Sequence, residues 1–204
     1  MIIQKFKKGP LGNNNYVVID EKSREAVLID CTENPKDMLD FIQSRKAELK
    51  YILLTHGHFD HILGLNELST DLLKKAMVHK DDRFLFDQID DFMDYLSLPH
   101  VTAPRISQYF DEGTPLFLGD IPIQIISTPG HTPGCVCFLI QDKLFSGDTL
   151  FFDSYGRTDL PKSSAAAMRN SLKKLFSSLP DQIQVFPGHG PSTTVGREKK
   201  HHQL

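Results

Sequence analysis

The chain has 204 residues, 40% of them hydrophobic and 24% charged, and a formal net charge of −3. This length suits one domain with a true hydrophobic core, and the charge balance excludes the basic field typical of proteins that bind nucleic acid or anionic membranes. With three cysteines there is no fully paired disulfide framework, and neither a signal peptide nor a membrane-spanning run is recognisable. We therefore expect a single cytoplasmic domain over residues 1–204.

The first quarter of the chain predicts short strands followed by a helix. Strand-like runs separated by turn signals lie at residues 2–6, 15–20 and 25–30. Asn34 and Pro35 are typical of a helix start, and Met38 and Ile42 fall on one face of a helix that we expect to reach about residue 47. The apolar run 51–54 predicts a strand that is covered on both sides.

Helices dominate the prediction for the middle of the chain. The expected elements are a helical stretch from residue 62 to about 76, a strand over 77–79, an amphipathic helix over 81–98 and a loop over 99–112. Asp60 stands just before the first of these helices, so we expect its side chain to cap that helix.

The second half of the chain predicts a hairpin, further strands and two helices. The expected strands are 116–118, 121–127, 135–141, 143–146 and 184–186, and the expected helices are 163–179 and 194–204. The order of strands and helices along the chain predicts an α/β domain with two sheets and the helices outside them.

A cluster of metal-binding residue types follows the strand predicted at 51–54. His56, His58, Asp60 and His61 lie within six residues, and Gly57 lets the backbone turn tightly between them. Burying imidazoles and a carboxylate together is costly unless something compensates them, and a divalent cation is the usual compensation. A histidine-rich surface turn without a metal is the alternative, and it is disfavoured because partners recur later in the chain.

Three further residues of ligand type each follow a predicted strand and stand beside a glycine: His131, Asp148 and His189. Together with the first cluster they make five histidines and two aspartates. A catalytic ion keeps three protein ligands and an open position, so seven ligands are too many for one ion. They suit two ions about 3.5–4 Å apart that share a carboxylate, as in two-metal hydrolases.

The HxHxDH pattern, followed by isolated His, Asp and His at strand ends, resembles the metallo-β-lactamase superfamily. This resemblance implies a four-layer αβ/βα sandwich with the site at one sheet edge. The motifs TPGHTPG, FSGDTLF and FPGHGPSTTVGRE are similar to those of its glyoxalase II (hydroxyacylglutathione hydrolase) branch, in a compact single-domain form.

The resemblance also implies two sets of ligands. The first ion is expected among His56, His58, His131 and Asp148. The second ion is expected among Asp60, His61, Asp148 and His189. Asp148 would then bridge the ions and Asp60 would orient the nucleophile, which makes these two aspartates the implied catalytic residues. Zinc is the expected metal, and iron and manganese accept the same ligands.

The implied activity is hydrolysis of a small-molecule thioester, such as S-lactoylglutathione, by a metal-bound hydroxide. The family's C-terminal helical domain, which supplies cations to the glutathione pocket, has no counterpart after Gly190, so a different thiol carrier stays open. Arg157 is the expected contact of a substrate carboxylate, with an ion pair to Asp159 as its alternative. We expect a monomer or a small homo-oligomer that binds neither nucleic acid nor membrane.

Other functions compatible with the same residues are a persulfide dioxygenase and a hydrolase of esters or lactones. The dioxygenase would hold one iron with His56, His131 and Asp148, a set that resembles a two-histidine, one-carboxylate triad. None of the three cysteines occupies a motif position, which disfavours a β-lactamase. Complete retention of the ligand set disfavours a non-catalytic binding module.

Overall fold

The computed structural model describes residues 1–202, which form two six-stranded sheets. Strands β1 to β6 of the first sheet are Ile2–Lys8, Asn13–Ile19, Glu25–Ile29, Glu48–Leu53, Ala76–His79 and Gln108–Phe110. They are arranged in chain order across the sheet. The pairs from β1 to β3 are antiparallel and those from β3 to β6 are parallel.

The second sheet has the order β12-β11-β10-β9-β8-β7. Strands β7 to β12 are Leu116–Leu118, Ile121–Ser127, Val136–Ile140, Lys143–Gly147, Gln184–Pro187 and Thr193–Thr194. Strand β9 is antiparallel to both β8 and β10, and β10 is parallel to β11. Strands β8, β10 and β11 therefore run the same way, and their carboxyl ends meet at one edge of the sheet.

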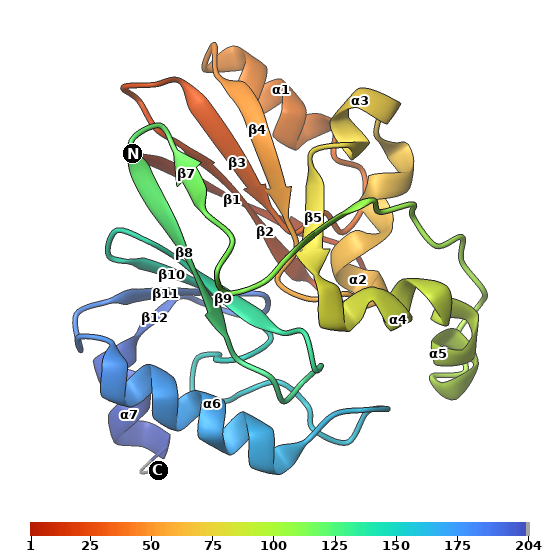
Figure 1. Ribbon diagram of the computed structural model, residues 1–204, viewed down its shortest axis with the longest axis vertical. Helices are drawn as coiled ribbons and strands as arrows, with labels where there is room; N and C mark the ends of the chain where they lie inside the picture. The colour runs from red at the N-terminus through yellow and green to blue at the C-terminus, as the bar shows by residue number, and fades with distance from the viewer. Residues whose placement is uncertain (203–204) are drawn as a thin grey trace.

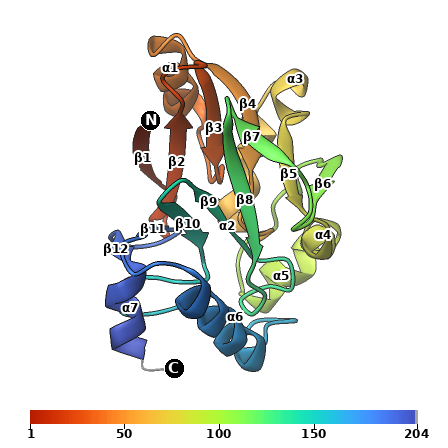
Figure 2. The ribbon, with the colours of Figure 1, turned by 60° about the vertical axis from the view of Figure 1, so that its left-hand side comes forward.

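Helices cover the outer faces of the two sheets (Figures 1 and 2). Helices α1 to α7 are Lys36–Ser44, Phe59–Ile62, Thr70–Leu73, Arg83–Asp87, Ile89–Tyr95, Ala165–Ser178 and Val195–His202. Helices α1 and α3 lie outside the first sheet, and α6 and α7 lie outside the second (Figure 1). None of the helices in the described part of the chain is both long and apolar enough to cross a bilayer.

Alternating side chains divide the core into layers. Strand β2 sends Val17 and Ile19 toward the helices of the first sheet, whereas its Tyr16 and Val18 pack between the sheets. A third cluster lies between the second sheet and α6, where Leu172 is fully buried. Because both faces of each sheet are covered, their central strands have continuous apolar runs. The four-layer αβ/βα sandwich expected from the sequence is thereby confirmed.

The two long helices expected in the middle of the chain are wrong in extent. In the first stretch, α2 continues into the 3₁₀ segment Leu63–Glu67, and the chain then becomes extended before α3 starts. Ser69 accepts a hydrogen bond from Leu72 N, so this side chain caps a new helix instead of continuing the old one. The second stretch breaks at Gln88 into α4 and α5.

The sequence did not predict two strands, β6 and β12, because both are very short. Strand β6 lies inside the segment expected to be a loop and pairs with β5, and β12 has only two residues that pair with β11. Neither is long enough to display a period of two, so their pairing depends on neighbours that are distant in sequence. The tail helix was predicted over 194–204, and its last two residues lie outside the described part of the chain.

Phe138 of β9 packs in the layer between the two sheets, so its substitution tests this layered arrangement. Its buried ring contacts that of Phe110 edge to face, with 5.6 Å between the ring centroids. Phe138→Ala is expected to lower the free energy of unfolding by about 3–5 kcal/mol, because the cavity refills only partly. Urea unfolding measures this, with the 45% exposed Phe117→Ala as the control. Equal losses in the two variants would contradict the layering.

Candidate metal centre

The seven predicted ligands come together at the edge where β4, β8, β10 and β11 end. His56 and His58 follow β4, His131 lies in the loop after β8, Asp148 directly follows β10 and His189 follows β11. Thr55 O accepts a hydrogen bond of 3.0 Å from Val136 N at the start of β9. That bond fastens the histidine-rich loop of the first sheet to the second sheet.

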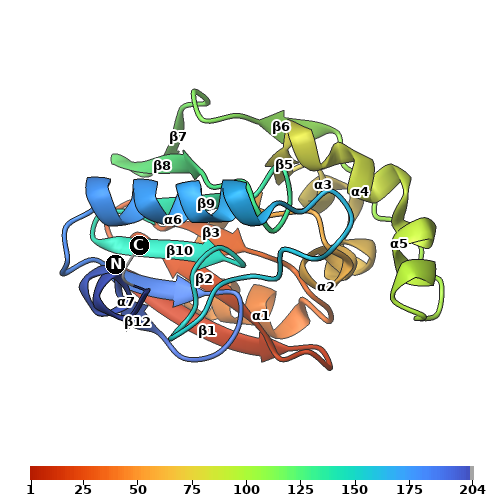
Figure 3. The ribbon, with the colours of Figure 1, turned by 90° about the horizontal axis from the view of Figure 1, so that it is seen from below.

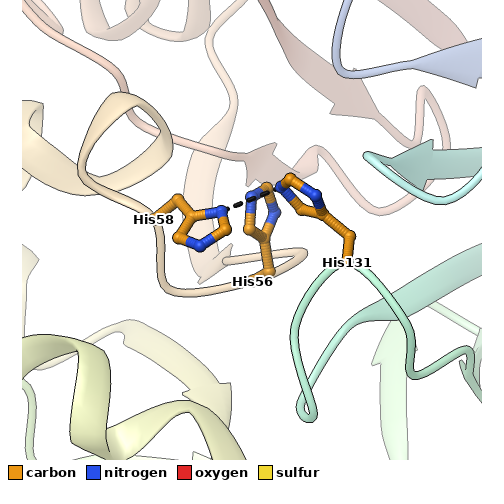
Figure 4. A group of neighbouring side chains, drawn as sticks. All are labelled: His56, His58 and His131. Atoms are coloured by element: carbon orange, nitrogen blue, oxygen red, sulfur yellow. Dashed lines mark hydrogen bonds between the residues drawn. The ribbon is translucent and has the colours of Figure 1, made fainter. Parts of the chain in front are cut away.

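His56, His58 and His131 form a first group, in which the facing ring nitrogens all lie within 4.8 Å of one another. All three side chains are buried. Figure 4 shows the rings converging from two loops, and His58 Nδ1 lies 2.8 Å from His131 Nε2. Three imidazole nitrogens that face a common point are the ligand set that a divalent cation takes from histidine.

Asp60, His61 and His189 form a second group within the same 4.8 Å limit. The carboxylate oxygen Oδ2 of Asp60 lies 3.6 Å from His189 Nε2 and 3.8 Å from His61 Nε2. The two groups are neighbours, since the ring centroids of His56 and His61 are 4.1 Å apart.

Asp148 contacts both groups. Its Oδ2 lies 3.5 Å from His131 Nε2 in the first group and 3.6 Å from His189 Nε2 in the second. Its Oδ1 lies 3.4 Å from His61 Nε2. The carboxylate therefore has the position that a bridging ligand between two ions requires.

Hydrogen bonds outside the cluster fix the orientation of four of the five imidazoles. In each of these four rings Nδ1 faces outward and lies within hydrogen-bond distance of an oxygen. The pairs are His56 with Thr55 Oγ1 (3.1 Å), His61 with Asp30 Oδ2 (2.9 Å), His131 with Arg157 O (2.8 Å) and His189 with Leu11 O (3.3 Å). A histidine that donates through one nitrogen presents the other as a metal ligand. Each ring is thus held with its Nε2 toward the centre.

Several of the inward atoms are buried without a hydrogen-bond partner in the described part of the chain. They include His56 Nε2, His61 Nε2 and Asp148 Oδ1. Leaving a buried polar atom unpaired costs about 1–3 kcal/mol. Three such atoms beside one another fit a divalent metal ion, which would satisfy all of them.

The charges around the cluster also fit a cation. Burial and the neighbouring imidazoles lower the pKa of His56 well below its usual value, and burial together with His131 lowers the pKa of His58 to about 3. Burial also lowers the pKa of His61, but the carboxylates of Asp30 and Asp148 outweigh it and raise that pKa well above its usual value. The rings of His56 and His58 are therefore neutral and able to act as ligands. The carboxylates around His61 favour a positive charge at the centre.

Asp60 does not cap a helix, so that expectation was wrong. The residue that precedes α2 is His58, and no side chain caps this helix. Asp60 lies in the first turn of α2, where its Oδ2 instead accepts a hydrogen bond of 2.9 Å from Asn13 Nδ2. The carboxylate is turned toward His189 because Asn13 in β2 holds it there.

The sequence did not single out Asp82, which connects two of the ligand loops. This fully buried carboxylate accepts hydrogen bonds from Gly57 N at 2.9 Å, Gly134 N at 2.7 Å and Thr132 Oγ1 at 2.7 Å. Gly57 lies between His56 and His58, and Thr132 follows His131. Asp82 thus holds together the two loops that carry the first group.

Asp30 was also missed as part of the site. It directly follows β3, and its carboxylate accepts hydrogen bonds from Thr55 N, Thr55 Oγ1 and His61 Nδ1. One sequence feature could have pointed to these two residues: Asp30 and Asp82 each come shortly after a strand, as the predicted ligands do. Neither aspartate stands beside a glycine or within a histidine cluster, which is what marks the predicted ligands.

Arg157 lies at the wall of the pocket above the centre, where it forms an ion pair. Its Nε and one terminal nitrogen each donate to the carboxylate of Asp159 at 2.9 Å. The alternative that the sequence left open is therefore present in the structure. Binding of a substrate carboxylate by Arg157 stays a prediction.

Gly188 packs against the ligands closely enough to test the geometry. A Cβ atom at this position would lie 2.5 Å from Asp148 Oδ1 and 2.9 Å from His61 Cε1. Gly188→Ala is expected to weaken metal affinity about 10–100-fold, because the ligands must move. Competition with a chromophoric chelator measures this, and Gly113→Ala, which meets only an ordinary contact with Asp111, is the control. Unchanged affinity in the first variant would contradict the geometry.

Fold and site together define a protein with a histidine- and aspartate-rich metal centre at the edge of a four-layer sandwich. Residues 9–189 match the model of the metallo-beta-lactamase superfamily. The chain belongs to this superfamily, whose members are mostly metal-dependent hydrolases.

Individual relatives agree over nearly the whole chain. The chain is 32% identical over 190 residues to hydroxyacylglutathione hydrolase GloC of Haemophilus influenzae, covering 91% of this chain and 90% of that protein. The crystal structure of the B3 metallo-beta-lactamase BLEG-1 matches with a TM-score of 0.87 at 30% identity, covering 98% and 97% of the two chains. That of TTHA1623 in a di-iron-bound form matches with a TM-score of 0.84 at 35% identity, covering 97% and 98%.

Proposed function

We propose that this protein is a two-metal hydrolase that cleaves a small-molecule thioester. The convergence of seven ligand residues, some of which form the floor of a pocket of about 470 Å³, carries this proposal. Pockets of this size accommodate small-molecule substrates. The proposed partner is the substrate alone, without nucleic acid or membrane.

Divalent ions at such a centre lower the pKa of bound water and polarise a substrate carbonyl. The residues of the chain supply the rest. Asp60, held by Asn13, faces the pocket and is placed to orient the attacking water. Phe92 stacks on the ring of His58, with 4.7 Å between centroids, and shields that side of the centre from solvent. Asp148 keeps the two ligand groups in a fixed relation.

The leaving group distinguishes a thioester from an amide. A thiolate departs without a proton, whereas an amide nitrogen needs a proton donor. The described lining includes Tyr155 and the candidate ligands, and a thioester needs none of them as a proton donor. The relative GloC, a hydroxyacylglutathione hydrolase by name, favours a thioester over the β-lactam amides suggested by the name of BLEG-1.

The completeness of the second group favours hydrolysis over persulfide oxidation. A mono-iron dioxygenase would need His56, His131 and Asp148 alone, and Asp60 and His189 would have no role at a metal. Here both converge with His61. Zinc is the proposed metal, and iron is its strongest competitor because TTHA1623 has a di-iron-bound form.

Reconstitution of chelator-treated protein tests the proposal. Zn²⁺, Fe²⁺ and Mn²⁺ are added separately, and each sample is assayed for cleavage of S-lactoylglutathione and of a chromogenic cephalosporin. Oxygen uptake with glutathione persulfide is measured in parallel. Thioester cleavage that is lost with the chelator and restored by metal is the expected result. Oxygen uptake without thioester cleavage, or faster cleavage of the cephalosporin, would refute the proposal.

A further inference from the structure

The walls of the pocket above the candidate metal centre are apolar. Phe92, Leu96 and Leu98 line one side, contributed by α5 and the residues that follow it. Leu11, from the turn between β1 and β2, and Leu160 also line the pocket. Helices α4 and α5 lie at the same end of the molecule as α2, which carries two of the ligands (Figure 3).

Large apolar side chains remain exposed at the mouth of this pocket. Leu11 is 56% exposed, Tyr155 47% and Leu98 39%. Exposed apolar groups that gather around one concave site are typical of a surface that is covered by a ligand. The polar ligands at the floor and the apolar mouth together suit a molecule with a reactive carbonyl at one end and a hydrocarbon at the other.

The described lining of the pocket offers an anionic substrate no unpaired lysine or arginine. Arg157 is the single lysine or arginine in the described lining, and both carboxylate oxygens of Asp159 accept from its guanidinium group. Tyr95 of α5 donates to the carbonyl oxygen of Asp159, which ties this loop to the apolar wall. A tripeptide thiol with two carboxylates therefore has no unpaired lysine or arginine as a partner in the described lining.

We propose that the preferred substrates are thioesters with an apolar acyl group. This inference rests on the proposed thioester hydrolysis and names its substrate class. The thiols that carry acyl groups are themselves polar, so the hydrocarbon of a thioester lies on its acyl side. In the reaction, water oxygen bonds to the acyl carbon and the carbon–sulfur bond breaks. The products are a carboxylate and a thiol, and the remaining proton goes to solvent.

An acyl series on one small thiol tests the inference. Acetyl, butanoyl and hexanoyl thioesters of N-acetylcysteamine are assayed with the metal-loaded protein, beside S-lactoylglutathione. The value of kcat/KM is expected to rise about two- to fourfold per methylene while the chain gains contact with the wall. Calorimetry with matching ketones, in which a methylene separates carbonyl and sulfur, should show the same trend in Kd without turnover.

Substitutions in the wall connect this trend to the pocket. Leu98→Ser and Leu11→Ser are each expected to lower the ratio of hexanoyl to acetyl kcat/KM at least threefold, because each removes apolar contact. Phe117→Ser is the control, since Phe117 is also an exposed large hydrophobe but lies outside the pocket lining. It should leave the ratio unchanged.

The outcomes separate the inference from the proposed function. Equal kcat/KM values across the acyl series, or faster cleavage of S-lactoylglutathione than of the hexanoyl thioester, would overturn the apolar-acyl preference and leave thioester hydrolysis standing. If no thioester is cleaved by the metal-loaded protein, the proposed function is overturned, and the inference with it.

Discussion

Asp148→Ala is expected to lower kcat/KM for thioester cleavage by on the order of a thousandfold, because several kcal/mol of transition-state stabilisation depend on correctly held ions. In the wild-type protein Oδ1 of Asp148 faces His61, and Oδ2 faces His131 and His189. Removing them leaves the first group without a carboxylate and the second with that of Asp60 alone. Bound metal per chain, measured by elemental analysis after dialysis, should fall together with activity.

Asp142→Ala is the matched control for this variant. Asp142 is an exposed aspartate directly before β10, the strand that ends beside Asp148, and its side chain pairs only with the neighbouring Lys143 in the described structure. Its loss should leave both metal content and kcat/KM unchanged. Full metal content and full activity in Asp148→Ala would show that this carboxylate is not a ligand.

Asp82→Ala is expected to weaken metal affinity about 10–100-fold although Asp82 is outside the ligand set. The substitution leaves Gly57 N and Gly134 N buried without their acceptor, at a cost of about 1–3 kcal/mol each. The loops that carry His58 and His131 then lose their common anchor. Metal competition and urea unfolding should therefore both report a loss.

A comparison of conservative variants separates positioning from simple destabilisation. Asp82→Asn retains one acceptor oxygen and should fall between the wild type and Asp82→Ala in metal affinity. Asp81→Ala removes the adjacent exposed carboxylate and should change neither metal affinity nor stability. If Asp82→Ala unfolds more easily but binds metal as tightly as wild type, Asp82 supports the fold alone.

The clustering of the candidate metal ligands could be predicted from sequence because their signal is local. His56, His58, Asp60 and His61 occupy one short turn, and His131 and Asp148 each follow a strand whose apolar run is visible in the sequence. Strand ends gather at sheet edges, so such residues tend to meet. The two-sheet architecture was predictable for the same reason, since covered strands are apolar throughout.

The residues that position the ligands could not be predicted in this way. Asp30 and Asp82 act through hydrogen bonds to loops that are 25 or more positions away in sequence. The pairing of Arg157 with Asp159 was foreseen only as one of two options, because either a substrate or a neighbouring acid can use the same guanidinium group. Tertiary contacts decide the first two cases, and a contact between residues two positions apart decides the third.

The helices beside the site were also set by tertiary context. Ile62 and Leu65 have a helix-like spacing, yet the chain follows a 3₁₀ path over Leu63–Glu67, where Gly64 packs closely against Cys31. The amphipathic pattern of residues 81–98 continues past Gln88, yet the backbone leaves the helical conformation there, and α5 then contributes Phe92 to the pocket lining. An apolar stripe gives the buried face of a helix but does not show where the backbone breaks.

Stepwise metal titration of the chelator-treated protein tests the two-ion centre most directly. Zn²⁺ is added in fractions of an equivalent, and bound metal per chain and the rate of thioester cleavage are measured on the same samples. Binding that saturates at two ions per chain, with the rate reaching its plateau only as the second site fills, is the expected result. Saturation at one ion with a full rate, or an undiminished rate without metal, would contradict it.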